Sequence, residues 1–407
     1  MVVEVLEEKI ENWNISEVGI LLVELAFSLI GSFISIFLIA HIFVLLNENF
    51  VSLGIFTLVS GLFVFIFQMF GGSICKRKTP LLVIRLSAGL SLFLLILILF
   101  LDEQLAQYYI LLALLWGSIM GFYFSASQFI IAKKTSGEKM LRFVATYTSI
   151  MSILQLIFPI TFGLIIYYGG FFATSTVVLV IAIFQLLASM LIKPDSKIEK
   201  TDKIDFKDYW MALKKAKHQK PALELWFIMF LTGFANTIPV LITAFVMLAF
   251  GSALNLGILV SLFALIKIFI PYFYRKFKKS RLIFYWIAII FPIASVSLLL
   301  IFGTPPFVIL FMGVNSVTRG IIFMEEEKTR LSAASYWNGG KLYIMESNLF
   351  YETALTTGGV ISAVLLIMAG SLYSQWIVML FLALTSFSFA LHGILVKLWQ
   401  KKHAEST

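Results

Sequence analysis

Glu24 is an ionisable residue inside a long apolar stretch. Ser28, Ser32 and Ser35 follow it at steps of three or four residues, so a helix would carry the carboxyl group and the hydroxyl groups along one stripe. Counted from Val18, Glu24 lies about 9–10 Å into the stretch at the helical rise per residue. Desolvation at such a depth favours the neutral carboxyl group, the property needed to take up and release a proton. The alternative is a structural glutamate that snorkels or pairs with a cation.

Three more charged residues lie in apolar stretches of the second half of the chain: Arg319, Glu346 and Glu352. A charge in hydrocarbon costs at least about 2.5–3.5 kcal/mol, so it needs a partner or a cavity. We expect Arg319 and one of the glutamates to meet at similar depth as a charge pair. The pair could be a charged gate, a site for an anionic substrate group, or a static bridge. Lys267 is equally ambiguous, because a lysine can snorkel.

Uncharged polar and aromatic residues in other apolar stretches are candidates for lining a substrate cavity. They are Ser28, Trp116, Tyr123, Asn236 and Asn315. Asn236 precedes Pro239, which removes a backbone donor and loosens a helix, and Asn315 lies four residues before Arg319 on the same helical face. Small hydroxyl residues in these stretches also pack helices together, which is the alternative to a cavity.

Patterns typical of enzymes, metal sites and cofactor sites are absent from the sequence. The four histidines are widely separated, and there is no metal-binding spacing, nucleophile elbow or phosphate-binding loop. The single cysteine, Cys75, cannot form an internal disulfide. We therefore expect no catalysis, no metal ion and no cofactor. One acidic cluster, Glu325–Glu327, is predicted to lie in a solvated loop.

The elements that position these residues must be membrane-spanning helices. Hydrophobic residues make up 60% of the chain and charged residues only 13%, and the mean hydropathy is +0.98, far from the values of a soluble domain. The net charge of +9 comes from short basic clusters between apolar stretches. That distribution is typical of loops that face anionic lipid headgroups and argues against nucleic acid as a partner.

The apolar stretches predict an all-α polytopic membrane protein of about twelve transmembrane helices. Each stretch is long enough to cross a core of roughly 30 Å. Nearly all lysines and arginines fall in every second connection, so the positive-inside rule predicts that both termini are cytoplasmic in a plasma-membrane protein. The predicted spans are 18–46, 50–73, 81–101, 105–131, 143–169, 172–192, 222–250, 253–273, 282–302, 305–324, 342–370 and 375–397.

A long polar segment, residues 193–221, divides the spans into two sets of six. We predict an N-terminal six-helix bundle over 1–192, a cytoplasmic linker over 193–221 and a C-terminal six-helix bundle over 222–407. Within the linker, apolar residues between Asp205 and Lys217 recur at helical spacing opposite lysines. This pattern predicts an amphipathic helix at the membrane surface.

The layout of six plus six spans with a basic central loop resembles the major facilitator superfamily. That superfamily has a glycine-rich basic turn between its second and third spans, and here the place holds Gly71, Gly72 and Lys76–Lys78. The expected aspartate is missing, with Ile74 and Cys75 in its region. Arg275–Arg281 forms a second basic loop at the equivalent place in the other half, as an internal repeat predicts.

The resemblance implies a secondary transporter that works by alternating access, with spans one, four, seven and ten along the central path. We expect a monomer that acts on a small-molecule or lipid substrate in the bilayer. The leading hypothesis is export of a small amphipathic solute, with Glu24 as the proton-coupling residue. The alternatives are a flippase for a lipid or lipid-linked glycan, and a solute importer.

Overall fold

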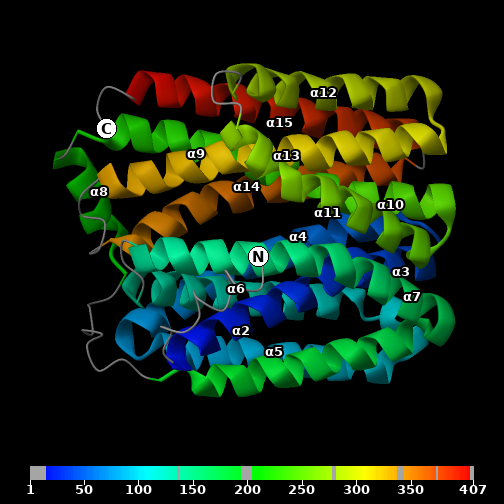
Figure 1. Ribbon diagram of the computed structural model, residues 1–407, viewed down its shortest axis with the longest axis horizontal. Coiled ribbons are helices and arrows are strands. Elements are labelled where there is room, and N and C mark those ends of the chain that lie inside the picture. Colours follow the sequence, from blue (N-terminus) through cyan, green and yellow to red (C-terminus); the bar gives the residue numbers. More distant parts are fainter. Residues whose placement is uncertain are drawn as a thin grey trace.

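The structure is a computed structural model, and every regular element in its described residues is a helix. Long helices lie side by side, with the first half of the chain in the lower part of Figure 1 and the second half in the upper part. The described residues are 15–134, 138–193, 204–215, 217–276, 281–336, 343–372 and 375–403.

The first half of the chain contains six long helical segments. The first is a continuous rod of α2 (Ile15–Ser32), the π-helical turn η1 (Phe33–Leu38) and α3 (Ile39–Leu45). It is followed by α4 (Phe50–Arg77), α5 (Pro80–Leu101), the short η2 (Asp102–Ala106), α6 (Tyr109–Lys134) and α7 (Glu138–Leu191).

The helix α7 supplies two segments, because the chain reverses direction at Gly170 (Figure 1). Gly170 has φ 76° and ψ 176°, a conformation that is open to glycine and that residues with a side chain rarely adopt. The predicted break between spans five and six at this glycine is confirmed.

The second half begins with α8 (Phe206–Lys215) and continues with six more segments. The first is α9 (Gln219–Phe234), interrupted by the 3₁₀ turn η3 (Ala235–Thr237) and continued by α10 (Ile238–Phe250). The others are α11 (Ala253–Lys276), α12 (Arg281–Phe302), α13 (Pro305–Tyr336), α14 (Ile344–Ser371) and α15 (Gln375–His403).

Ten segments are long and apolar enough to cross a membrane when α7 counts as one. The division of α7 at Gly170 and the shorter apolar stretch Ala253–Phe269 of α11 raise the number in the described residues to twelve. The predicted all-α membrane protein of about twelve transmembrane helices is therefore confirmed. Large apolar side chains such as Phe100 and Tyr168 are exposed on the outside of the helices, where lipid replaces water as the solvent.

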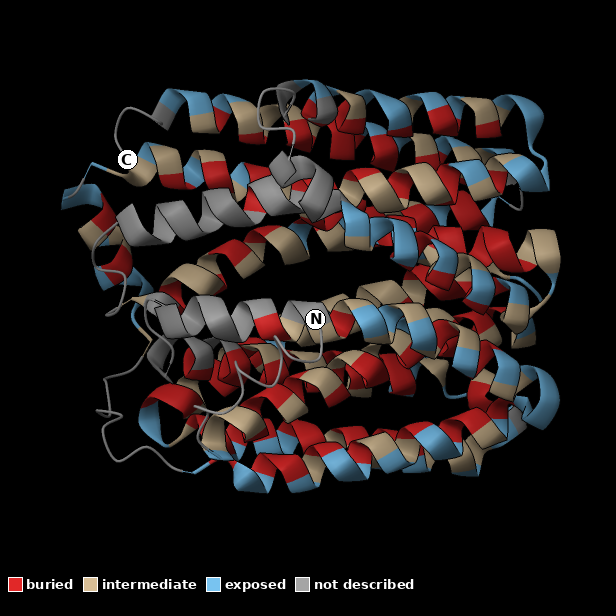
Figure 2. Cartoon of the chain, in the orientation of Figure 1, coloured by how far each residue is buried: buried red, intermediate tan, exposed pale blue. Residues whose placement is uncertain are grey.

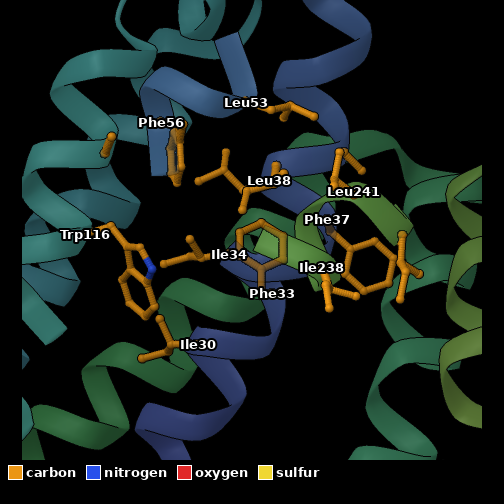
Figure 3. Packing of buried hydrophobic residues seen from close by; sticks show 14 of the residues in the cluster. Ile30, Phe33, Ile34, Phe37, Leu38, Leu53, Phe56, Trp116, Ile238 and Leu241 are labelled. Atoms are coloured by element: carbon orange, nitrogen blue, oxygen red, sulfur yellow. The ribbon is translucent and has the colours of Figure 1, made fainter. Parts of the chain in front are cut away.

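Buried side chains concentrate where helices face one another, and exposed residues lie along the outer helices (Figure 2). The two halves meet where α4 packs against α14 and α7 packs against α11. The side chain of Phe37, in the first segment, also lies beside Ile238 of the second half (Figure 3).

The two ends of the molecule differ in their chemistry. One end, at the left of Figure 1, contains α8 and the close of α4, with Lys76, Arg77 and Lys78; we call it the basic end. At the opposite end α10 packs against α3, and the rings of Phe50 and Phe245 lie 5.7 Å apart. The halves are thus joined at that end by apolar side chains.

The predicted solvated loop at Glu325–Glu327 is wrong. These residues continue α13, which extends to Tyr336, and the side chain of Glu326 is buried. Hydropathy ended the predicted span at the first acidic residues, whereas the helix continues past them and Glu326 has a buried partner on α15, described below.

Glycines allow α9 and α14 to cross closely. A Cβ atom added to Gly358 would lie 2.0 Å from the backbone oxygen of Phe230, and one added to Gly233 would lie 2.0 Å from that of Leu355. Neither position has room for a methyl group, and both obstructing atoms belong to the backbone. The crossing therefore depends on these two glycines.

We expect Gly358→Ala to lower the free energy of unfolding by about 1–3 kcal/mol, because overpacking forces the two helices apart. Thermal unfolding of the purified protein in detergent measures this loss. The matched control is Gly89→Ala in α5, where an added Cβ meets nothing within 4 Å and alanine favours the helix. Equal stability of the two variants would contradict a tight crossing.

Candidate functional site

The carboxyl group of Glu24 is buried in the first half of the molecule among hydroxyl groups. The Ser127 hydroxyl of α6 donates a hydrogen bond to Oε1 of Glu24. One turn along α2, the hydroxyl oxygens of Ser28 and Tyr147 lie 2.9 Å apart, and Tyr123 is near enough to interact electrostatically with Glu24. We call these five residues the carboxyl cluster.

An aromatic wall lies beside the carboxyl cluster. The Phe27 ring stacks on Tyr123, with ring centroids 3.4 Å apart and an interplanar angle of 9°. The same ring has Trp116 at 5.9 Å and Phe124 at 6.0 Å. Trp116 is directed toward Ile30 and Ile34 (Figure 3). A carboxyl group thus adjoins an apolar, flat surface.

The structure brings Glu24, Ser28 and Tyr123 together, but it does not extend the predicted stripe. The Ser32 hydroxyl donates to the carbonyl of Ser28 at 2.8 Å, and Ser35 is exposed within η1. A π-helical turn holds more residues than an α-helical turn, so it rotates the side chains that follow out of register. Ser127 and Tyr147 were not among the predicted site residues; for Ser127, the signal was its position four residues after Tyr123 on the same helical face.

A second polar group lies in the second half, around Arg319 of α13. Nη2 of Arg319 donates a 2.9 Å hydrogen bond to Oδ1 of Asn236. Asn236 belongs to the η3 interruption, where its side chain is exposed between buried Ala235 and Thr237. Asn315 is buried one turn before Arg319. The structure therefore joins a predicted cavity residue, Asn236, directly to a predicted gate residue, Arg319.

Lys267 of α11 interacts electrostatically with Arg319. It lies one turn beyond Phe263, whose ring contacts Gly313 of α13, so Lys267 is on the face of α11 that turns toward α13. Its side chain is nevertheless exposed. We call Arg319 and Lys267 the cationic pair.

Glu326 and His392 form a buried contact further along α13. Nε2 of His392 lies 3.3 Å from Oε2 of Glu326, and the histidine ring has no exposed surface. Glu326 also interacts electrostatically with Arg319. Hydropathy alone could not identify this acidic residue as part of the polar group.

Glu346 pairs with Lys76 across the two halves, at the basic end. Lys76 lies in the last turn of α4 and Glu346 in the first turn of α14, and the two buried side chains form an ion pair. Oε1 of Glu346 also accepts a 3.2 Å hydrogen bond from the backbone N–H of Asp205. Three segments, α4, α14 and the linker, therefore meet at one carboxylate.

The expected pairing of Arg319 with Glu346 is not the one that forms, because α13 and α14 have different neighbours. α14 packs against α4 and α9, whereas α13 packs against α12 and α11. Glu346 is therefore held by Lys76, and Arg319 by Asn236. Glu352 is half-buried in α14, six residues beyond Glu346.

The helix α8 rests on the second half near this ion pair. The Asp205 side chain accepts hydrogen bonds from the backbone N–H groups of Lys207 and Asp208 and so caps α8. Tyr209 and Leu213, on its apolar face, are buried against protein as part of a cluster with Ala222. Burial raises the pKa of the Tyr209 phenol, which therefore stays neutral at physiological pH.

Comparisons with known proteins agree with this architecture. The model of the Major Facilitator Superfamily matches residues 14–324. The nucleoside transporter NupG aligns with a TM-score of 0.61 and 15% identity over 96% of this chain and 99% of its own. The D-xylose-proton symporter aligns with a TM-score of 0.64 and 12% identity over 93% of this chain and 95% of its own. The human organic anion transporter MFSD10 aligns with a TM-score of 0.58 and 16% identity over 94% of this chain and 98% of its own. None of the curated proteins compared is similar enough in sequence to count as a relative.

Proposed function

Since this chain belongs to the Major Facilitator Superfamily and is a secondary transporter of the membrane, we propose that it couples export of a small amphipathic solute to a proton carried by Glu24. The proposal places both termini in the cytoplasm and the protein in the plasma membrane. The carboxyl cluster is the observation that carries it.

Hydroxyl groups are suited to both forms of a carboxyl group that binds and releases a proton. A hydroxyl donates to the ionised carboxylate and accepts from the protonated acid. Ser127 already donates to Glu24, and Tyr123 is close by. In the part of the chain that the structure describes, no lysine or arginine forms an ion pair with Glu24, so no fixed positive charge holds it in the ionised form.

The aromatic wall is the evidence for an amphipathic solute as the substrate. Flat apolar rings bind the apolar part of such a molecule. Amphipathic solutes enter a bilayer unaided, so a transporter serves chiefly to remove them. The likeness to a D-xylose-proton symporter supports a proton as the coupling ion.

Proteoliposomes loaded with fluorescein, ethidium or uridine test this function. With the wild type, we expect an imposed proton gradient to accelerate release of at least one solute. Glu24→Gln, which cannot ionise, should lose that acceleration and keep exchange of the solute without a gradient. Glu48→Gln, at an exposed position outside the helices, should behave as the wild type.

Two outcomes would count against the proposal. Gradient-driven release that persists in Glu24→Gln would remove Glu24 as the proton carrier. Gradient-driven accumulation of the solute in place of its release would make the protein an importer.

A further inference from the structure

The cationic pair lacks a full set of partners. Nη1 of Arg319 is shielded from water and has no hydrogen-bond partner among the described atoms, although Nη2 is bound to Asn236. Lys267 takes part in no hydrogen bond or ion pair within the described part of the chain. An unsatisfied buried donor is costly, so this arrangement favours a further acceptor.

The described charges near the cationic pair include a single acidic side chain. Among the described groups, Glu326 of α13 is the acid that acts on Arg319, and it also lies beside His392 of α15. Within the part of the chain that the structure describes, one carboxylate is therefore near the two cations. The described charges leave an excess of positive charge, and an anion bound between the two cations would offset their mutual repulsion.

We propose that Arg319 and Lys267, with Asn236 orienting the guanidinium, bind the oxyanion of the transported solute, a carboxylate or a phosphate. The inference rests on the proposed transport function and names the class of its substrate. It does not depend on Glu24, which lies in the other half of the molecule.

The geometry suits an oxyanion better than another polar group. Asn236 fixes the guanidinium by one edge and leaves the Nη1 donor for an oxygen of the ligand, and a guanidinium matches carboxylate and phosphate groups in shape and charge. The ammonium group of Lys267, which interacts electrostatically with Arg319, provides a second positive contact. The η3 interruption beside Pro239 is what brings the Asn236 amide to this position.

Binding to the purified full-length protein tests the proposal without any transport step. The probes are phenylacetate, phenyl phosphate, the neutral phenylacetamide and the cation phenethylamine, with thermal stabilisation of the protein as the readout. We expect at least one of the two anions to bind, and to bind more tightly than the neutral and cationic analogues. Nanodiscs with and without phosphatidate form a separate arm for a lipid phosphate.

The variants Arg319→Gln and Lys267→Gln should each weaken binding of the anion about tenfold or more, since each removes a charged contact. Lys267 is exposed, so its variant keeps the test valid even if Arg319→Gln fails to fold. Arg85→Gln removes an exposed arginine of α5 and should bind as the wild type.

Three results would overturn the anion site: no binding of any anion, equal binding of phenylacetamide, or binding that is unchanged in both variants. Stabilisation by phosphatidate alone, lost in the two variants, would keep the site and identify a lipid as its ligand. Glu24→Gln should bind the anion normally, so failure of proton coupling and failure of this site are distinguishable.

Discussion

Lys76→Glu should separate the two halves at the basic end and stop transport. The substitution places a second carboxylate against the buried Glu346, where neither charge is hydrated. Loss of one partner of a buried ion pair costs about 3–5 kcal/mol, and repulsion adds to that cost. Because each 1.4 kcal/mol is about a factor of ten, the closed form of this end should become rare, and alternating access needs both forms.

Spin labels on Lys78→Cys and Lys401→Cys, with Cys75→Ser to remove the native thiol, measure this separation. Lys78 follows the last residue of α4, and Lys401 lies near the C-terminal end of α15. Both residues are exposed. We expect a longer distance between the labels in Lys76→Glu. The matched control is Arg77→Glu, which reverses the next charge along the helix at an exposed position. An unchanged distance in Lys76→Glu would show that the pair does not hold the halves together.

Glu326→Gln should destabilise the protein strongly. Glu326 supplies the negative charge beside Arg319 and His392, and an arginine left without it within the membrane costs about 3–5 kcal/mol. Thermal unfolding in detergent should show a large loss of stability. The double variant Glu326→Gln/Arg319→Gln, which removes both charges, should recover much of it, as coupled sites do.

An exposed ion pair offers the control for this prediction. Glu224 pairs with Lys402, and the two side chains are 30% and 51% exposed, so Glu224→Gln should cost about 0–1 kcal/mol. If Glu326→Gln were as mild as Glu224→Gln, or if the double variant were no more stable than the single one, the charge balance around Arg319 would have to be rejected.

The fold could be predicted from hydropathy and from the positions of the basic residues, because both patterns extend over whole helices. Twenty apolar residues can only cross the bilayer as a helix, and Gly170 marked a reversal within a continuous helical pattern. Glu326 was assigned to a loop because a charged residue ends an apolar stretch in the sequence. Hydropathy cannot show that a partner such as His392 lies on another helix.

The partners of the charged residues could not be predicted, because they depend on which helices are neighbours in space. Arg319 and Glu346 belong to consecutive helices, yet their helices pack against different elements. Ser35 does not lie on the predicted stripe because it belongs to the π-helical turn η1. Nothing in the sequence of that turn predicted it. Glu24 and Ser28 were predicted to share a helical face because that relation depends on local spacing alone, whereas Tyr123 approaches them from α6.

The two ends of the molecule should respond differently to water when they open, because one is apolar and the other is basic. Opening the end where Phe50 faces Phe245 brings water onto hydrocarbon side chains, and that exposure is unfavourable in proportion to its area. Opening the basic end lets water hydrate Lys76 and Glu346, which offsets much of the attraction lost between them. Water therefore resists one movement and assists the other, so the empty transporter should rest open toward the basic end more readily than toward the apolar end.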